Sequence, residues 1–292
     1  MALRWNKGRL QKRARPLGSA GHYYEPGFVS AAERTRVLAW LDTLHPLWEQ
    51  RFSRHHPPPP GQEQRSLLRP VYWLGNWQFA CLDYYRPPKR INGRCMQAEP
   101  FPAVLAALVA RIEKDARELF APTDIPEKWH LNTCLVNFYG TRVENGVRTD
   151  VARVGEHRDF EPGPVGSISL GERALLQFVS SQRPGDRDEV VLQTWLEDCS
   201  LQLFAGDRWK KQLFHRVQRV EKTGAHRFPL HVERFETRRV NFTFRYVPDE
   251  HVVPYASLPA TARADVREYV ETLARHSAFF ARQLEGSARV SP

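Results

Sequence analysis

The stretch RRVNFTFR, from Arg238 to Arg245, alternates apolar and polar side chains near the end of the chain. In an extended strand successive side chains point to opposite faces, so Val240, Phe242 and Phe244 share one face. The opposite face carries Arg239, Asn241, Thr243 and Arg245. The apolar face predicts a core strand, and two guanidinium groups on the polar face require a separate explanation.

The rest of the second half of the chain has the same period of two. From Leu131 onward short β-rich runs follow one another: LNTCLVNFY, VGSISLG, ALLQFVS, EVVLQTW, SLQLFA, LFHRVQRV and RVNFTFRYV. Many short strands separated by Gly, Pro and Asp turns favour a sandwich or jelly roll over a parallel α/β sheet.

Helical patterns flank this β-rich region. The stretch at 30–44 begins with Ser30 and Glu33 in capping-box spacing, 101–120 has a broad apolar stripe, and 257–284 predicts one C-terminal helix. The proline run in HHPPPPGQEQ predicts an exposed loop, whose two histidines we expect to be solvated. We therefore expect a basic arm at 1–21, one domain at 22–250 and a helical extension at 251–292.

The composition is that of a folded soluble protein with a basic bias. The chain has 292 residues, 41% of them hydrophobic and 26% charged, with a formal net charge of +10. The residues before the first acidic one, Glu25, include Arg4, Lys7, Arg9, Lys12, Arg13 and Arg15. Such an arm suits contact with nucleic acid, and it suits solubility equally well.

The cysteine pattern and the hydropathy bear on the compartment. Cys81, Cys95, Cys134 and Cys199 are scattered without a C-x-x-C pair, so neither a zinc ribbon nor a disulfide framework is indicated. No apolar run approaches a membrane span, and the Arg-rich start, with a single Ser in its first twenty residues, is a poor match to a transit segment. We expect a cytoplasmic, reducing location, no membrane partner and a monomer.

A candidate metal site begins in GEHRDFE, where His157 and Asp159 lie two residues apart and point to one face of a strand. Alone, such a pair is more often an ordinary hydrogen-bonded pair. His215, in KQLFHRVQRV, follows an apolar pair on a later predicted strand, and its alternative role is that of a core histidine. Two histidines and one carboxylate leave metal positions open, as is typical of non-haem Fe(II) oxygenases.

The arginines of the opening stretch suggest an anionic ligand for the same site. Arg239 and Arg245 are about 20 Å apart along a strand and could hold the two ends of a short dicarboxylate. Asn137 and Tyr139, on one face of another strand, could add neutral hydrogen bonds. The alternative is that both arginines form surface ion pairs.

Five ordered motifs, NFY, GEHRDFE, VGSISLG, LFHRV and RVNFTFR, resemble those of the AlkB family of Fe(II)- and 2-oxoglutarate-dependent dioxygenases. The resemblance covers residues 22–250 and is strongest over 131–248. It implies a double-stranded β-helix, which is a jelly roll, buttressed by helices. The activity implied is oxidative dealkylation of N-alkylated bases in DNA or RNA, of the 1-methyladenine and 3-methylcytosine type. O2 is consumed and 2-oxoglutarate is decarboxylated to succinate.

The resemblance also assigns roles to particular side chains. The Fe(II) ligands would be His157, Asp159 and His215, and 2-oxoglutarate would be bound by Asn137, Tyr139, Arg239, Asn241 and Arg245. Thr243 receives no role, and Arg238, which points away from this face, is expected to be dispensable for 2-oxoglutarate binding.

Base recognition requires a nucleotide that is flipped out or single-stranded. By the resemblance, Glu161 would approach the base edge, Trp77 would stack on the base, and Tyr84 would lie near a phosphate. Ordinary packing is the alternative for Trp77 and Tyr84. The segment 140–156 is longer than in simple family members, and it forms either a lid carrying Arg142, Arg148 and Arg153 or a longer hairpin.

Two further functions stay open from the sequence. The same oxygenase chemistry could act on a protein, a lipid or a small molecule, because the fold and the iron site do not fix the substrate. A jelly roll of this charge could also bind nucleic acid without catalysis.

Overall fold

The computed structural model describes the chain except for residues 1–20, 81–94, 181–188, 219–227, 229 and 289–292. Its helices are α1 (Ala31–Leu41), α2 (Ala103–Leu119), α3 (Ala260–Ala274) and α4 (Ala278–Ala288). Short helical turns are η2 (Pro122–Asp124), η3 (Arg208–Gln212), η4 (Asp249–His251) and η5 (Tyr255–Ser257).

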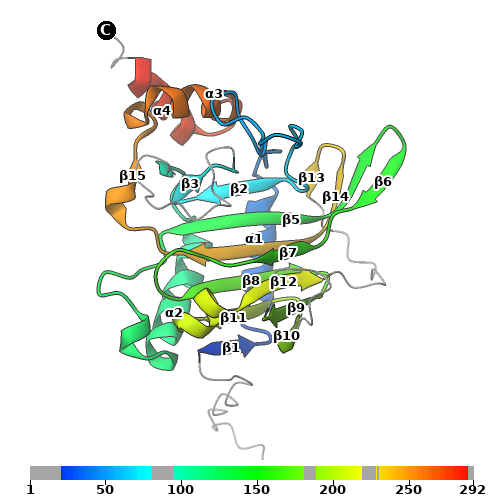
Figure 1. The fold of residues 1–292 in the computed structure, drawn as a ribbon, viewed down its shortest axis with the longest axis vertical. Helices are drawn as coiled ribbons and strands as arrows, with labels where there is room; N and C mark the ends of the chain where they lie inside the picture. The colour runs from blue at the N-terminus through cyan, green and yellow to red at the C-terminus, as the bar shows by residue number, and fades with distance from the viewer. Residues whose placement is uncertain (1–20, 81–94, 181–188, 219–227, 229, 289–292) are drawn as a thin grey trace, which may run out of the picture.

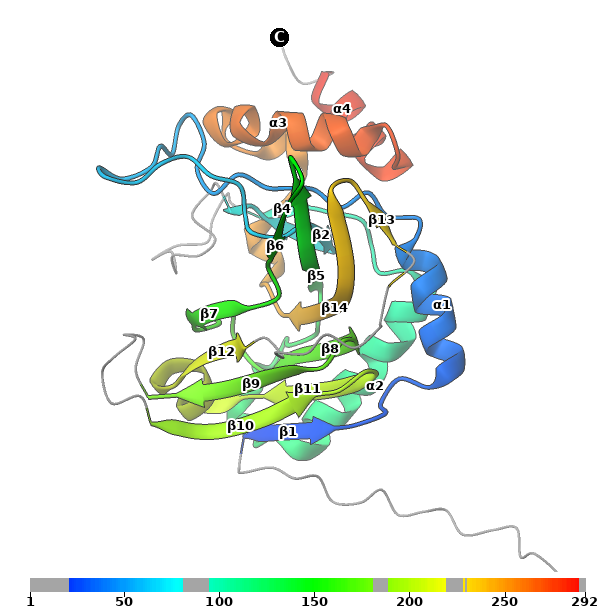
Figure 2. The same ribbon diagram turned by 90° about the vertical axis from the view of Figure 1, so that its right-hand side faces the viewer.

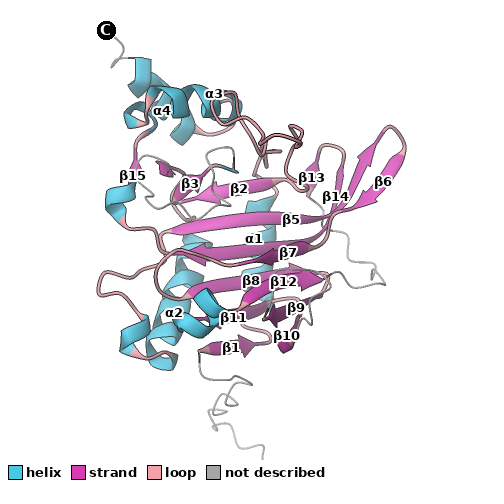
Figure 3. Ribbon diagram, in the orientation of Figure 1, coloured by secondary structure: helices cyan, strands magenta, loops and turns pink. Residues whose placement is uncertain are grey.

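Most strands belong to two antiparallel sheets (Figure 3). The larger sheet runs β1 (His22–Glu25), β11 (Ser200–Phe204), β8 (Val165–Gly171), β14 (Phe235–Arg245), β5 (Thr133–Glu144) and β2 (Val71–Leu74), with β13 (His231–Val232) on β14 and β6 (Val147–Asp150) on β5. The smaller sheet runs β10 (Val190–Leu196), β9 (Ala174–Val179), β12 (Phe214–Gln218) and β7 (Val154–His157). A third sheet joins β15 (Val252–Val253), β4 (Cys95–Gln97) and β3 (Asn76–Gln78).

The stretch RRVNFTFR is part of β14, which lies between β5 and β8 in the larger sheet. Asn241 is opposite Asn137 of β5 and Ser169 of β8. Val240 and Phe242 are fully buried on the apolar face, as the alternation predicts. Because β14 has partners on both sides, its polar face is held in a fixed position.

The two sheets face each other, and helices α1 and α2 cover the outer face of the larger sheet (Figure 2). Helix α1 begins with the expected capping box, in which Ser30 accepts from the Glu33 amide and Glu33 accepts from the Ser30 amide. Two facing antiparallel sheets buttressed by helices confirm the predicted jelly roll. The strands β1 and β2, which complete the two edges of the larger sheet, were not among the predicted strands.

The prediction of one C-terminal helix is wrong, because the segment forms α3 and α4 with a break at 275–277. The Ser277 hydroxyl accepts from the amide of Phe280 and donates to Glu99, which begins a new helix and turns Phe280 into the core. Val270 and Phe280 are fully buried in the same hydrophobic cluster as the larger sheet. No helix within the described residues combines the length and the apolarity that crossing a membrane requires.

The proline-rich loop is tied to α3, so its histidines are not merely solvated as expected. His55 Nδ1 lies 2.7 Å from Asp265 Oδ1, and His56 Nδ1 lies 3.3 Å from Asp265 Oδ2. Nearby, the amide of Arg51 donates to the carbonyl of Arg65 at 2.9 Å. Residues 47–70 therefore form a folded-back segment, which is held together by the Arg51–Arg65 backbone hydrogen bond and is bound to α3 through His55 and His56.

Candidate active site

A cavity of about 570 Å³ lies between the two sheets. The larger sheet contributes Asn137, Tyr139, Ser167, Gln202, Arg239, Asn241, Thr243 and Arg245 to its lining, and the smaller sheet contributes Val154, His157, Leu176, Leu196, His215 and Val217. The polar face of β14 therefore points into this cavity. A concave site of this size with convergent polar groups is typical of a small-ligand site.

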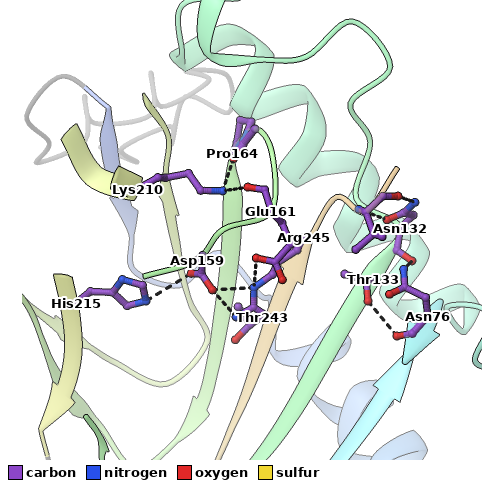
Figure 4. Close-up of polar contacts among 12 residues, drawn as sticks. Asn76, Asn132, Thr133, Asp159, Glu161, Pro164, Lys210, His215, Thr243 and Arg245 are labelled. Carbon is purple, nitrogen blue, oxygen red and sulfur yellow. Dashed lines mark hydrogen bonds and ion pairs between the residues drawn. The ribbon is translucent and has the colours of Figure 1, made fainter. Parts of the chain in front are cut away.

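The three candidate metal ligands lie together in the cavity wall. His157 ends β7 and is paired across the sheet with His215 of β12, so their rings lie 4.1 Å apart between centroids. Asp159 follows two residues later, with Oδ2 3.4 Å from His215 Nε2 (Figure 4). One potential ligand atom from each residue lies within 4.8 Å of the others. Antiparallel pairing of β7 and β12 thus brings together residues that are far apart in the sequence.

Burial favours the neutral form of both histidines, which is the form that binds a metal. The His157 Nδ1 lies 2.8 Å from the Gly155 carbonyl oxygen and donates to it, which leaves Nε2 as the ligand atom. Burial lowers the pKa of His157, and burial together with the neighbouring His157 lowers the pKa of His215 to about 3. Neutral imidazoles of this kind coordinate transition metals.

Arg245 favours the ionised form of the candidate ligand Asp159 and fixes its orientation. Nε and Nη2 of Arg245 donate to Asp159 Oδ1 at 2.9 and 2.7 Å, so Oδ2 stays turned toward His215. Burial alone would raise the pKa of Asp159, but Arg245 holds it well below its usual range. One oxygen of the carboxylate is thus used for positioning and the other faces the site.

Glu161 does not reach the cavity, which contradicts its predicted role at the base edge. It is 1% exposed, does not line the cavity, and has Oε2 3.5 Å from Arg245 Nε (Figure 4). Burial raises its pKa. Lys210 packs beside it, with Nζ donating to the backbone carbonyls of Glu161 and Gly163, and burial lowers the pKa of Lys210 to about 8. Glu161 therefore contacts the guanidinium of Arg245 from outside the cavity lining.

Arg239 has the features of a carboxylate-binding residue. It is 2% exposed, its Nη2 donates to Ser169 Oγ at 3.1 Å, and its guanidinium carbon lies 4.9 Å from the centroid of the Tyr139 ring. Its buried Nε and Nη1 make no hydrogen bond, and it has no ion pair, within the described residues. Burial lowers its pKa, yet an arginine stays charged. A buried guanidinium with two unmet donors fits a carboxylate.

The side-chain amide of Asn241, two residues after Arg239, is held in place by hydrogen bonds. Asn241 Nδ2 donates to Ser167 Oγ at 2.7 Å and to the Ile168 carbonyl at 3.1 Å, and its Oδ1 accepts from Thr243 at 2.9 Å. This contact gives Thr243 a role that the sequence did not reveal. Arg238 points away from the cavity and pairs with Asp150 and Glu172, as expected from the alternation.

Trp77 lies in the core, which contradicts its predicted stacking on a base. Its side chain is 1% exposed, stacks on Phe79 at 4.4 Å between centroids, and donates from Nε1 to Glu49 at 2.8 Å. Tyr269 of α3 and Phe280 of α4 cover its remaining faces. Tyr84, the residue predicted near a phosphate, lies outside the described residues.

The segment 140–156 forms the β5–β6 hairpin, which projects from the larger sheet (Figure 1). Arg142 pairs with Glu144 and Arg148 pairs with Glu236, and neither these arginines nor Arg153 lines the cavity. Of the two alternatives, the hairpin is therefore correct. The arginines that do line the cavity beyond β14 are Arg51, Arg65, Arg69 and Arg158, and sequence reasoning assigned none of them.

Two imidazoles and one carboxylate beside a buried guanidinium, all inside a jelly roll, define a metal-dependent site with open coordination positions. The sequence model of the 2OG-Fe(II) oxygenase superfamily matches residues 21–245. The chain belongs to this superfamily. The protein is therefore an Fe(II)- and 2-oxoglutarate-dependent dioxygenase, and the expected cofactors, Fe(II), 2-oxoglutarate and O2, are those of its family.

Solved structures show more distant similarity. The chain is 19% identical to OsALKBH1, covering 78% of this chain and 99% of that one with a TM-score of 0.46. It is 12% identical to IDO from Bacillus thuringiensis over 77% of this chain and 92% of that one, with a TM-score of 0.35. It is 15% identical to the Escherichia coli ribosomal oxygenase YcfD in complex with cobalt and 2-oxoglutarate, covering 49% of this chain and 29% of that one with a TM-score of 0.27. No curated protein matches the sequence significantly.

Proposed function

We propose that this dioxygenase removes alkyl groups oxidatively from N-alkylated bases in DNA or RNA. The observation that carries the proposal is the positive lining of the cavity mouth next to the metal site. Arg51 and Arg65 lie on one side, in the folded-back segment 47–70, and Arg158 lies beside the metal ligands. Guanidinium groups at the entrance favour a substrate whose backbone carries phosphates.

Each candidate site residue then has a defined task. Bound Fe(II), held by His157, Asp159 and His215, would supply the activation of O2 coupled to decarboxylation of 2-oxoglutarate. Arg245 keeps Asp159 ionised and oriented, and Arg239 would bind a carboxylate of 2-oxoglutarate. Leu176, Leu196 and Val217 form an apolar part of the cavity wall.

Base recognition would use residues other than those expected from the family. Phe160, directly after Asp159, lines the cavity and is partly exposed, so its ring would contact a base that enters the cavity. The cavity has room for a base that has left its stack.

Release of formaldehyde tests the proposal. The protein is incubated with Fe(II), 2-oxoglutarate and O2 and with DNA or RNA oligonucleotides that carry 1-methyladenine or 3-methylcytosine. We expect formaldehyde from at least one methylated oligonucleotide and none from unmethylated controls or from the His157→Ala variant. Continued succinate production without formaldehyde from any member of the panel would refute dealkylation of these bases.

Hydroxylation of a protein or a small molecule is the second candidate function. The observation in its favour is that Glu161 and Trp77, the expected base-reading residues, are both buried away from the cavity. Intact mass spectrometry separates the two functions. An added oxygen on a candidate substrate supports hydroxylation, whereas loss of a methyl group from an oligonucleotide supports dealkylation.

A further inference from the structure

Arg69 contacts two of the residues expected to bind 2-oxoglutarate, although it lies outside every motif of the resemblance. Its Nε donates to Asn137 Oδ1 at 2.8 Å, and its guanidinium carbon lies 5.0 Å from the centroid of the Tyr139 ring. It lines the cavity and is partly buried. The side chain is therefore directed into the wall of the site rather than toward solvent.

The position of Arg69 is set by the edge strand β2. Val71 pairs with Asn137 of β5, and the carbonyl of Pro70 accepts from the amide of Phe138 at 3.2 Å. Proline also fixes its own backbone dihedral and restricts that of the residue before it. Arg69 is thus held beside β5 by the pairing of two strands.

Two guanidinium groups approach the same aromatic ring. Arg239 reaches Tyr139 from β14 with its guanidinium carbon 4.9 Å from the ring centroid, and Arg69 reaches it from the segment just before β2 at 5.0 Å. No acidic side chain of the described residues forms an ion pair with either of them. Two like charges against one ring repel each other, and an anion bound beside both would offset that repulsion.

We propose that Arg69 is a specificity-determining residue for the co-substrate, forming with Arg239 a two-guanidinium site for the carboxylate remote from the metal. A 2-oxo acid with a second carboxylate would gain a charge-assisted hydrogen bond from each arginine. A 2-oxo acid of the same length that ends in a methyl group would gain neither. This selection concerns the co-substrate alone and does not depend on which molecule is oxidised.

Calorimetric titration of the full-length, Mn(II)-loaded protein with two acids tests the proposal. The acids are 2-oxoglutarate and 2-oxopentanoate, which has the same chain length without the second carboxylate. For Arg69→Gln we expect the Kd of 2-oxoglutarate to rise roughly 10- to 100-fold and that of 2-oxopentanoate to change less than about twofold. Arg69→Lys should restore part of the difference, because the charge remains while the planar fork is lost. Steady-state kinetics should show the same change in KM for 2-oxoglutarate with kcat retained.

Arg36→Gln is the matched control, since Arg36 is an exposed arginine of helix α1 and does not line the cavity. It should leave both dissociation constants unchanged. Equal weakening of both acids by Arg69→Gln would overturn the proposal and make Arg69 a support for Asn137 only. Unchanged binding of 2-oxoglutarate by the Gln and Lys variants would overturn it as well. Because the titration contains no nucleic acid, its outcome is separate from that of the dealkylation assay.

Discussion

Arg239 allows the sharpest test of how the cavity binds 2-oxoglutarate. Its guanidinium is 2% exposed and has two buried donors, Nε and Nη1, without hydrogen bonds in the described part of the chain. If a carboxylate satisfies these donors, Arg239→Gln removes one partner of a buried, hydrogen-bonded charge pair. Such a change costs about 2–5 kcal/mol of binding, which corresponds to a roughly 30- to 5,000-fold rise in Kd.

The same substitution has a different effect on the free protein. Without 2-oxoglutarate, the buried charge of Arg239 contacts the neutral side chains of Ser169 and Tyr139 and forms no ion pair within the described residues, so its desolvation is not offset by an anion. The unfolding temperature of ligand-free Arg239→Gln is therefore expected to be unchanged or higher. The increase in unfolding temperature that 2-oxoglutarate gives the wild type should be lost.

The adjacent Arg238 provides the control. Arg238 pairs with Asp150 and Glu172 and points away from the cavity, so Arg238→Gln should lower the stability of the free protein and keep its affinity for 2-oxoglutarate. Calorimetric titration and thermal unfolding with and without 2-oxoglutarate measure both effects. The reasoning fails if Arg239→Gln binds 2-oxoglutarate like the wild type, or if it destabilises the free protein as much as Arg238→Gln does.

Three other experiments test separate parts of the structure. Trp77→Phe removes the indole donor to Glu49 in the core, so urea unfolding should show a loss of about 1–3 kcal/mol in the free energy of unfolding, with kcat/KM on a methylated oligonucleotide retained. Unchanged stability with a reduced kcat/KM would instead place Trp77 in the substrate site. Burial raises the pKa of Glu49 from 4.5 to about 7, so the folded protein keeps a proton that the unfolded chain releases. The unfolding free energy of the wild type should therefore fall between pH 4.5 and 7 by roughly 3 kcal/mol relative to Glu49→Gln, and parallel pH profiles would contradict this. Replacing Arg51 and Arg65 together by Gln should weaken oligonucleotide binding and reduce its salt slope by about 2, and an unchanged slope would place the phosphates elsewhere.

The polar face of β14 was predictable because it depends only on the local alternation of a strand. Arg239, Asn241 and Arg245 all line the cavity, and Arg238 points away, as a period of two requires. His157 and His215 required more, since their proximity depends on the pairing of β7 with β12. The ordered motifs of the resemblance supplied that long-range information.

The errors concern residues whose surroundings come from distant parts of the chain. Trp77 is covered by Tyr269 and Phe280 from the C-terminal helices, and no local pattern indicates that contact. Glu161 lies beyond the end of β7, where the alternation of a strand no longer fixes the direction of a side chain. The contacts of Arg69 with Asn137 and Tyr139 were missed because they arise from the pairing of β2 with β5.

Coupling between decarboxylation and base repair is the decisive measurement for this dioxygenase. Succinate and the restored unmethylated base are quantified in the same reaction, with an oligonucleotide that carries 1-methyladenine or 3-methylcytosine. Dealkylation within the cavity predicts that restored base and succinate rise together in nearly equal amounts, and that both disappear in the His157→Ala variant. Succinate that forms at the same rate with methylated and unmethylated oligonucleotides, without any restored base, would contradict the proposed function.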